Sequence, residues 1–144
     1  MSRIPRRLFV LFLSLLLICC TAAPAAARTF SSLGELQQFI EKHSPADLAA
    51  SGPHYAELEG TVVEMHALGV NNHWQITLQV DDPRATPPLG ADGPQLIVHF
   101  RLHLDEPPFR IGDTITVFGT VNELYSSVIL PEVLAKTING TEDF

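Results

Sequence analysis

Cysteine is nearly absent from this 144-residue chain, and the two residues present, Cys19 and Cys20, stand next to each other near the N-terminus. Both lie at the end of an apolar run and before Ala25-Ala26-Ala27, a pattern at which a leader is removed. A mature chain that begins after Ala27 therefore contains no cysteine. This excludes a disulfide framework, a thiolate nucleophile and a cysteine metal site from it.

Positive charge is also scarce, because the chain has 9 Lys and Arg residues against 16 Asp and Glu residues. Three of the arginines precede residue 8, so the part beyond Ala27 keeps six basic residues and has a formal charge of −10. Nonspecific binding to nucleic acid depends on a basic surface that releases counterions. The composition disfavours such binding and binding to anionic membranes, although a local basic groove remains compatible with it.

Several catalytic motifs are missing beyond Ala27. There is no Gly-x-Ser-x-Gly elbow, no phosphate-binding loop and no Cys–His pair. Asp81-Asp82 and Asp105-Glu106 are adjacent carboxylates, but a proline follows each pair directly. We interpret both pairs as turn-forming residues rather than as an acid–base couple, and we expect a protein that is not an enzyme.

The N-terminus has the composition of an export signal. Three arginines among the first seven residues precede an apolar run from Leu8 to Ile18, and small residues follow as far as Ala27. This pattern predicts a signal peptide over residues 1–27 and a periplasmic or secreted protein. The run is shorter than the roughly 20 residues that cross a bilayer, so no membrane span is expected after cleavage. A retained anchor helix is the alternative.

Lipid attachment is a second alternative for the same segment. Leu17-Ile18-Cys19-Cys20 loosely resembles a bacterial lipobox, in which a cysteine after the apolar run is lipidated. The residue before that cysteine is usually Gly, Ala or Ser, and neither Ile18 nor Cys19 fits. We therefore favour cleavage by signal peptidase I over a lipid anchor at Cys19 or Cys20.

The first segment of the mature chain, residues 28–54, is predicted to be helical. Apolar residues spaced along one face, with Ser32 and Glu35 in a capping-box pattern, indicate a helix over Ser32–His43. Ser44-Pro45 ends this helix, and Pro45–Ala50 is expected to add one further helical turn.

Beyond it, residues 55–136 predict a β-domain, and residues 137–144 a short polar tail. Three of its strands alternate strictly between apolar and polar residues, which is typical of a sheet with one face in the core. Gly60 and Gly119 interrupt two of the strands, and such glycines mark a bulge, a bend or a close backbone approach. A phase slip at Val62-Val63 predicts a bulge, and Gly69–Asn72 predicts a tight turn. The expected strands are Tyr55–Leu68, His73–Val80, Leu96–Leu104, Asp113–Asn122 and Ser126–Leu130.

Two segments, Leu58-Glu-Gly-Thr-Val and Ile111–Val121, resemble strands of the nucleic-acid-binding OB-fold superfamily. The resemblance covers Tyr55 to about Val133 and implies a mainly β protein, namely a five-stranded Greek-key OB-like barrel preceded by a short N-terminal α-helix. A helix normally lies between the third and fourth strands of this fold, but Pro107 and Pro108 make one improbable here. We expect the N-terminal helix to cover that end of the barrel instead.

The resemblance implies a binding surface on the outer face of the second and third strands and on the loops at its rim. Trp74 and Phe100 have the core phase, so few aromatic residues remain to stack on bases. The outward aromatic residues are Phe118 on the fourth strand and Tyr125 in the next loop. An ordinary solvated sheet face is the alternative interpretation. The polar and apolar residues predicted on this face are His73, Gln75, Thr77, Gln79, Ile97, His99, Arg101 and His103.

No cofactor and no metal site is predicted from the spacing of the six histidines. His99 and His103 share a strand face but stand roughly 13 Å apart, at about 3.3 Å per residue, so they cannot bind one ion together. A cross-strand pair of His73 with one of them stays open.

The function expected from these observations is binding without catalysis. The first hypothesis is an exported OB-fold module that binds a peptide, a glycan or a small ligand, or a protein partner, on the face defined above. The alternative is a single-stranded nucleic-acid-binding protein outside the cytoplasm, disfavoured by charge and by the shortage of stacking residues. A secreted enzyme ranks last.

Overall fold

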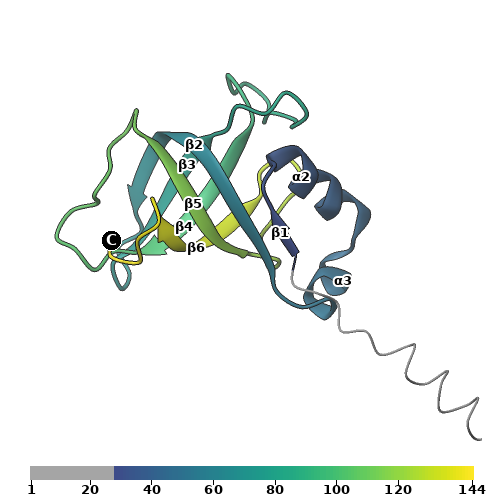
Figure 1. Ribbon diagram of the computed structural model, residues 1–144, viewed down its shortest axis with the longest axis horizontal. Coiled ribbons are helices and arrows are strands. Elements are labelled where there is room, and N and C mark those ends of the chain that lie inside the picture. The colour runs from purple at the N-terminus through teal and green to yellow at the C-terminus, as the bar shows by residue number, and fades with distance from the viewer. Residues whose placement is uncertain (1–27) are drawn as a thin grey trace, which may run out of the picture.

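Five strands wind into a closed barrel in the computed structural model, which describes residues 28–144 (Figure 1). Their order is β2-β3-β4-β6-β5, and the barrel closes because β2 also pairs with β5. Neighbours are antiparallel except β4 and β6, which are parallel. This topology confirms the predicted mainly β class and the OB-like Greek-key barrel. The strands are β2 (His54–Ala67), β3 (His73–Gln79), β4 (Gln95–Arg101), β5 (Thr114–Val121) and β6 (Glu132–Ile138).

The predicted signal peptide, with its two cysteines, lies outside the described residues. No helix in residues 28–144 is long and apolar enough to cross a membrane.

Strand β2 bends so that it belongs to both sides of the barrel. Its first half pairs with β5 and its second half with β3, and both partners meet it at Thr61. The register shifts between Val62 and Glu64, which confirms the predicted bulge. At Gly60 an added Cβ would lie 2.8 Å from the carbonyl oxygen of Gln79, so the backbones approach too closely for a side chain. The bend therefore depends on glycine.

Gly119 marks an even closer approach, between β5 and β6. A Cβ built there would overlap the carbonyl group of Leu134, and the register of the two strands shifts between Phe118 and Gly119. The prediction that this glycine interrupts a strand for a close approach or a bulge is confirmed on both counts.

The turn between β2 and β3 also has its predicted conformation. Gly69, Asn71 and Asn72 all take positive φ angles, of 73°, 51° and 54°. Glycine adopts this left-handed region freely and asparagine tolerates it better than most residues.

The prediction of a last strand at Ser126–Leu130 is wrong, because β6 begins after Pro131. Proline has no N–H to contribute to a ladder. The Ser126 hydroxyl instead donates to the Glu132 carbonyl and accepts from the Glu132 N–H, which holds residues 126–132 as a loop.

The segment interpreted as a polar tail is also part of the fold. Ile138 and Phe144 are 1% and 5% exposed, and the rings of Phe144 and Phe100 meet edge to face at 5.7 Å. The barrel core therefore extends to the last residue of the chain.

The predicted helices are present as α2 (Leu33–Lys42) and α3 (Pro45–Ala50). Ser32 caps α2 by accepting from the Glu35 N–H, and Ser44 forms a complete capping box with Asp47 in α3. A short strand β1 (Arg28–Phe30) precedes them and pairs in parallel with the start of β2. Leu33, Leu36 and Ile40 turn the apolar face of α2 into the core.

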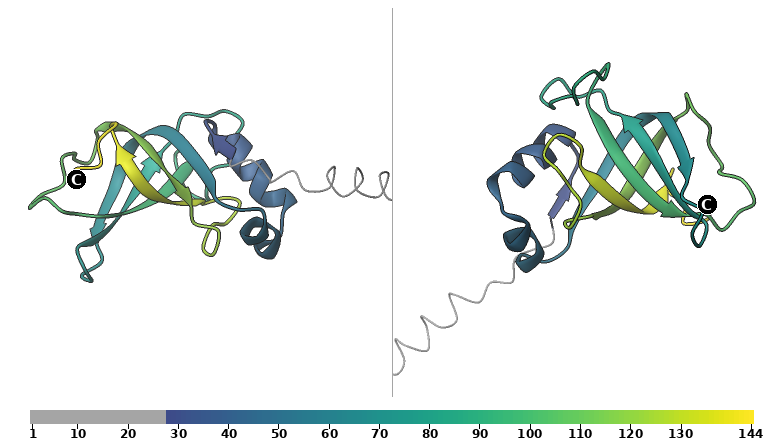
Figure 2. Two further views of the ribbon diagram at one scale, coloured as in Figure 1. Left: turned by 60° about the horizontal axis from the view of Figure 1, so that its bottom comes forward. Right: turned by 180° about the vertical axis from the view of Figure 1, so that it is seen from behind.

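The prediction that the helix covers the end between the third and fourth strands is wrong, because α2 lies at the opposite end (Figures 1 and 2). Its contacts are with the β3–β4 and β5–β6 loops, through Gln37. Phe100, Phe109 and Phe144 close the other end with edge-to-face ring contacts. Leu104, the predicted end of the third strand, is 47% exposed because β4 ends at Arg101.

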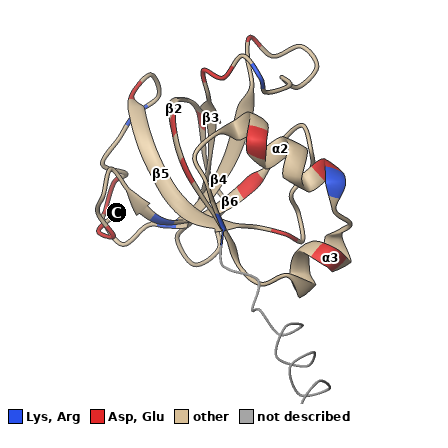
Figure 3. Ribbon diagram, turned by 45° about the vertical axis from the view of Figure 1, so that its right-hand side comes forward, with Lys and Arg blue, Asp and Glu red and all other residues tan. Residues whose placement is uncertain are grey.

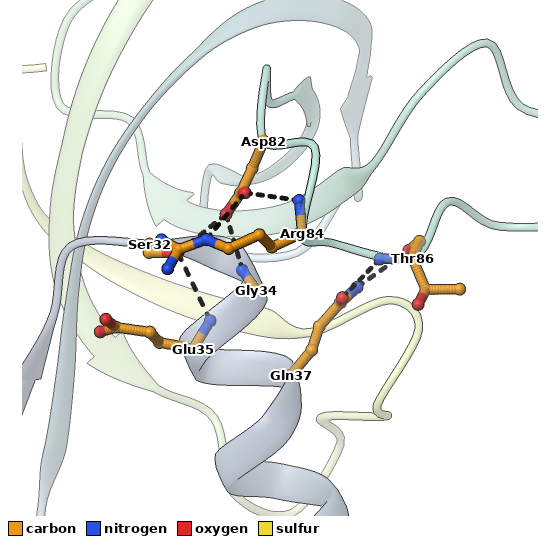
Figure 4. A network of polar contacts seen from close by, with 7 residues as sticks. All are labelled: Ser32, Gly34, Glu35, Gln37, Asp82, Arg84 and Thr86. Carbon is orange, nitrogen blue, oxygen red and sulfur yellow. Dashed lines mark hydrogen bonds and ion pairs between the residues drawn. The ribbon is translucent and has the colours of Figure 1, made fainter.

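A polar network fixes α2 to the β3–β4 loop (Figure 4). The Asp82 carboxylate accepts from the Ser32 hydroxyl at 2.8 Å and from the Gly34 and Arg84 N–H groups at 2.9 Å each. The Gln37 amide exchanges two hydrogen bonds with the backbone of Thr86, of 2.9 and 2.7 Å. The Gly34 hydrogen bond, more than any other contact, lowers the pKa of Asp82 against the opposing effect of burial.

Gly119→Ala is expected to lower the free energy of unfolding by about 2–3 kcal/mol, because the added methyl forces β5 and β6 apart. Urea denaturation followed by circular dichroism measures the change. Gly93→Ala is the matched control, since its Cβ would meet only the flexible Gln79 side chain. Equal losses for the two variants would contradict the proposed close approach.

Asp82→Asn is expected to lower the free energy of unfolding by about 1–2 kcal/mol at pH 7, because hydrogen bonds to a charged acceptor are stronger than those to a neutral one. The folded-state pKa lies below the unfolded value of 3.8. The stabilisation is therefore complete above that value and is lost as the pH falls through the folded-state pKa.

Thermal unfolding at a series of pH values from 7 to 2.5 tests this expectation. The difference between the wild-type protein and Asp82→Asn should shrink below about pH 4. Asp81→Asn, at the exposed neighbouring position, serves as the control and should unfold like the wild-type protein throughout. A gap between wild type and Asp82→Asn that stays constant to pH 2.5 would exclude the carboxylate as its cause.

Candidate functional site

A small hollow of about 190 Å³ lies on the outer face of β3, β4 and β6. Cross-strand pairing places His73 opposite Arg101 and Gln75 opposite His99, and β6 brings Leu134 beside His99. Three predicted site residues thus meet at one place. The hollow is lined by His73, His99, Phe100, Arg101, Leu134 and Ala135.

The two imidazoles in the hollow contact each other directly. His73 Nε2 lies 3.2 Å from His99 Nδ1, and the rings are edge to face with centroids 5.2 Å apart. The other ring nitrogen of His99, Nε2, lies 3.5 Å from Glu132 Oε1 on β6. The His99 and Glu132 side chains are 13% and 21% exposed. A carboxylate, an imidazole and a second imidazole therefore form a chain across three strands.

The row of contacts from Glu132 through His99 to His73 favours one arrangement of protons. The Glu132 carboxylate accepts only, so it favours a proton on His99 Nε2. His99 Nδ1 is then an acceptor for the N–H at His73 Nε2, and His73 Nδ1 is left with a free lone pair. Burial, followed by the nearby charges of His99 and Arg101, lowers the pKa of His73 and favours its neutral form.

Arg101 adds a guanidinium to the rim of the hollow. Three other cations of the described residues have local contacts: Arg84 pairs with Asp82, Arg28 lies over the Phe30 ring, and Lys136 lies over the Tyr55 ring. Figure 3 shows how few basic positions interrupt the acidic ones. Arg101 is exposed and faces His73 across the ladder, beside the 43% exposed side chain of Leu134. The hollow thus combines a fixed cation, an imidazole acceptor and an apolar wall.

Two residues predicted on this face are not accessible. Thr77 and Ile97 are 4% and 6% exposed, so their prediction as outward surface positions is wrong. They pair with each other at the middle of the ladder, where β2 and β6 flank them, and the Thr77 hydroxyl lies 3.5 Å from the Glu64 carboxylate.

Other predicted residues lie outside the hollow. Gln79 pairs with Gln95 at the far end of the ladder, and His103 follows the end of β4, where its N–H donates to the Phe144 carbonyl. Phe118 stacks on the Tyr55 ring, with centroids 5.7 Å apart, on the β2–β5 side. Tyr125 is 71% exposed in the β5–β6 loop.

Sequence reasoning missed what β6 contributes: Glu132, Leu134 and Ala135. Their strand was expected before Pro131, and its bulge beside Gly119 disrupts the alternation that would have revealed it. Within residues 28–144 no group of three or more His, Cys, Asp or Glu side chains is arranged to hold a metal ion. The cross-strand histidine pair left open above does form, between His73 and His99.

The strand order and the bent β2 define the class of this protein as an OB-like β-barrel. No protein-family model matches the chain. Among curated proteins, 67 residues are 39% identical to 8-amino-7-oxononanoate synthase of Pseudomonas fluorescens Pf-5. The match covers 44% of this chain and only 16% of that synthase.

Two solved structures are similar in shape at low sequence identity. A lipoprotein of Klebsiella pneumoniae, provisionally described as nucleic acid-binding, has a TM-score of 0.47 and 17% identity over 76% of this chain and 89% of its own. The structure of yeast Stn1 and Ten1 has a TM-score of 0.43 and 14% sequence identity, and the match covers 78% of this chain and 61% of the matched chain. At these scores the assignment of the barrel rests on the strand pairing of this chain itself.

The proton arrangement in the hollow is a testable consequence of its geometry. Long-range ¹H–¹⁵N NMR at pH 7.5 should find both His99 and His73 protonated at Nε2. The reason is that the Glu132 carboxylate sets the tautomer of His99, which in turn sets that of His73. Glu132→Leu removes the acceptor and should convert His99 to a tautomer mixture. The exposed His103 serves as an internal control and should not change. A single, unchanged tautomer in Glu132→Leu would contradict the role assigned to this carboxylate.

Proposed function

We propose that this chain is a non-enzymatic, exported OB-fold module that binds a peptide, a glycan or another small polar ligand at the hollow on β3, β4 and β6. The observation that carries the proposal is the convergence of His73, His99 and Arg101 beside the exposed Leu134. Hydrogen-bonding groups that converge next to apolar surface are the usual composition of a ligand site.

The size of the hollow supports an extended ligand. About 190 Å³ accommodates one side chain or one sugar ring, and is small for a site that encloses a whole ligand. A second hollow of about 430 Å³ at the β2–β3 turn shares His73 and includes Trp74, Leu102 and Leu104 in its lining. A peptide or oligosaccharide that crosses His73 would contact both hollows.

The chemical groups of the first hollow indicate what such a ligand presents. Arg101 donates to a carboxylate or to another strong acceptor, and the free lone pair at His73 Nδ1 accepts from a hydroxyl or an amide. Leu134 and Ala135 pack against an adjacent apolar group. A peptide carboxyl terminus or an acidic sugar fits this combination.

Single-stranded nucleic acid is less well supported. Such binders use aromatic platforms and a basic groove. Here Tyr55 and Phe118 stack on each other, Lys136 lies over the Tyr55 ring, and Phe100 in the hollow is 4% exposed. Export is proposed from the arginines, apolar run and small residues of positions 1–27.

Native mass spectrometry of the protein purified from the cells that produce it tests the binding proposal. We expect a fraction of the wild-type protein to carry a bound ligand, and Arg101→Ala to lose it. Arg110→Ala is the matched control, because Arg110 is also exposed but precedes β5 and does not line the hollow, and it should keep the ligand. Retention of the ligand by Arg101→Ala, or its loss from both variants, would contradict the site.

Fluorescence anisotropy with labelled oligonucleotides addresses the alternative. We expect weak binding at low salt that does not depend on Arg101. Micromolar binding that weakens steeply with salt and is lost in Arg101→Ala would replace the peptide or glycan proposal with nucleic acid.

A further inference from the structure

We propose that His73 and His99 form a two-histidine site for a borderline divalent metal ion such as Zn²⁺ or Cu²⁺, with Glu132 orienting His99. The metal site lies at the wall of the hollow, but it rests on the placement of nitrogen atoms and not on the proposed ligand. Imidazole nitrogen is a preferred donor for both ions.

The spacing of the two nitrogens fits one shared ion. With metal–nitrogen bonds of about 2.0–2.1 Å, two ligands of a tetrahedral or octahedral ion stand about 2.9–3.4 Å apart. His73 Nε2 and His99 Nδ1 are 3.2 Å apart. The ion replaces the proton on His73 Nε2, the neutral His73 ring carries its proton on Nδ1 instead after exchange with solvent, and each ring turns so that its lone pair points toward the ion.

The surroundings of His99 have the outer shell that a metal-binding histidine usually has. Its second nitrogen, Nε2, faces the Glu132 carboxylate at 3.5 Å, and both side chains are largely buried. A carboxylate in this position fixes the ring, keeps the proton on Nε2 and makes Nδ1 a better donor. Glu132 therefore already holds His99 in the tautomer that a shared ion requires.

The remaining coordination positions open into the hollow. No third His, Cys, Asp or Glu among the described residues is placed to complete a cluster, so water fills these positions, or a donor atom of a ligand in the hollow. Two strands of the closed barrel hold the two histidines, and such a rigid support favours chelation over binding by a single imidazole.

The charges around the pair come from three neighbouring strands. Arg101 on β4 faces His73 and repels a cation, whereas Glu132 on β6 attracts it. On β2, Glu64 and His66 pair with Thr77 and Gln75, farther along the ladder from His73. Removal of the Arg101 guanidinium should therefore strengthen metal binding, by about three- to tenfold for a single charge at short range.

Isothermal titration calorimetry of the untagged full chain with ZnCl₂ or CuCl₂ alone tests the site. We expect one ion per chain, with Cu²⁺ bound more tightly than Zn²⁺. His73→Ala and His99→Ala should each weaken binding at least tenfold, and Glu132→Gln by about tenfold. His103→Ala, at an exposed histidine outside the hollow, is the matched control and should bind as the wild type does.

Two further measurements keep the test independent of folding. Circular dichroism establishes that each variant retains its strands. In ¹⁵N NMR of the wild-type protein, Zn²⁺ should move the His73 proton from Nε2 to Nδ1 and shift His99 Nδ1, while His103 stays unchanged. Absence of stoichiometric binding, or binding that survives the loss of both histidines, would overturn the proposal. Arg101→Ala separates the two proposals, because this substitution should abolish binding of the ligand but strengthen binding of the metal ion.

Discussion

Strands β5 and β6 come together at Gly119, and the placement of β6 in the barrel depends on that one close approach. The carbonyl group of Leu134 occupies the space in which any other residue at position 119 would place its Cβ. Strand β6 is bulged beside this contact and pairs in parallel with β4 on its other side. Its residues Glu132 and Leu134 consequently lie beside His99. The geometry of the candidate site thus follows from a backbone contact on the neighbouring strand.

The two ends of the barrel are closed by different means, and this leaves the face between them open. At one end Asp82 and Gln37 tie α2 to the β3–β4 loop through hydrogen bonds, while Leu33 and Leu36 fill the opening. At the other end three phenylalanine rings pack edge to face. Neither closure involves His73, His99 or Arg101, so the outer face of β3 and β4 carries polar groups that the core does not need.

Electrostatics distinguishes this face from the rest of an acidic protein. Arg101 is exposed beside the His73 and His99 imidazoles, and the Glu132 carboxylate on the neighbouring strand contacts His99. The Arg101 guanidinium would strengthen the binding of a ligand that carries an acceptor group, and it would weaken the binding of a metal ion. The two proposals for this hollow therefore differ in the expected sign of the effect of Arg101.

Local sequence determined much of this fold: the capped helices, the alternating strands β3 to β5, the bulge after Val62 and the glycine contacts at Gly60 and Gly119. These follow from periodicity and from backbone conformations that few residues allow, which are properties of neighbouring positions in the chain. The face composed of His73, His99 and Arg101 was also predictable, since alternation assigns sides. Only the tertiary structure decided where β6 lies, which end α2 covers, and that Glu132 reaches His99. Those contacts join residues that are distant in sequence, and they depend on how the barrel closes rather than on any local pattern.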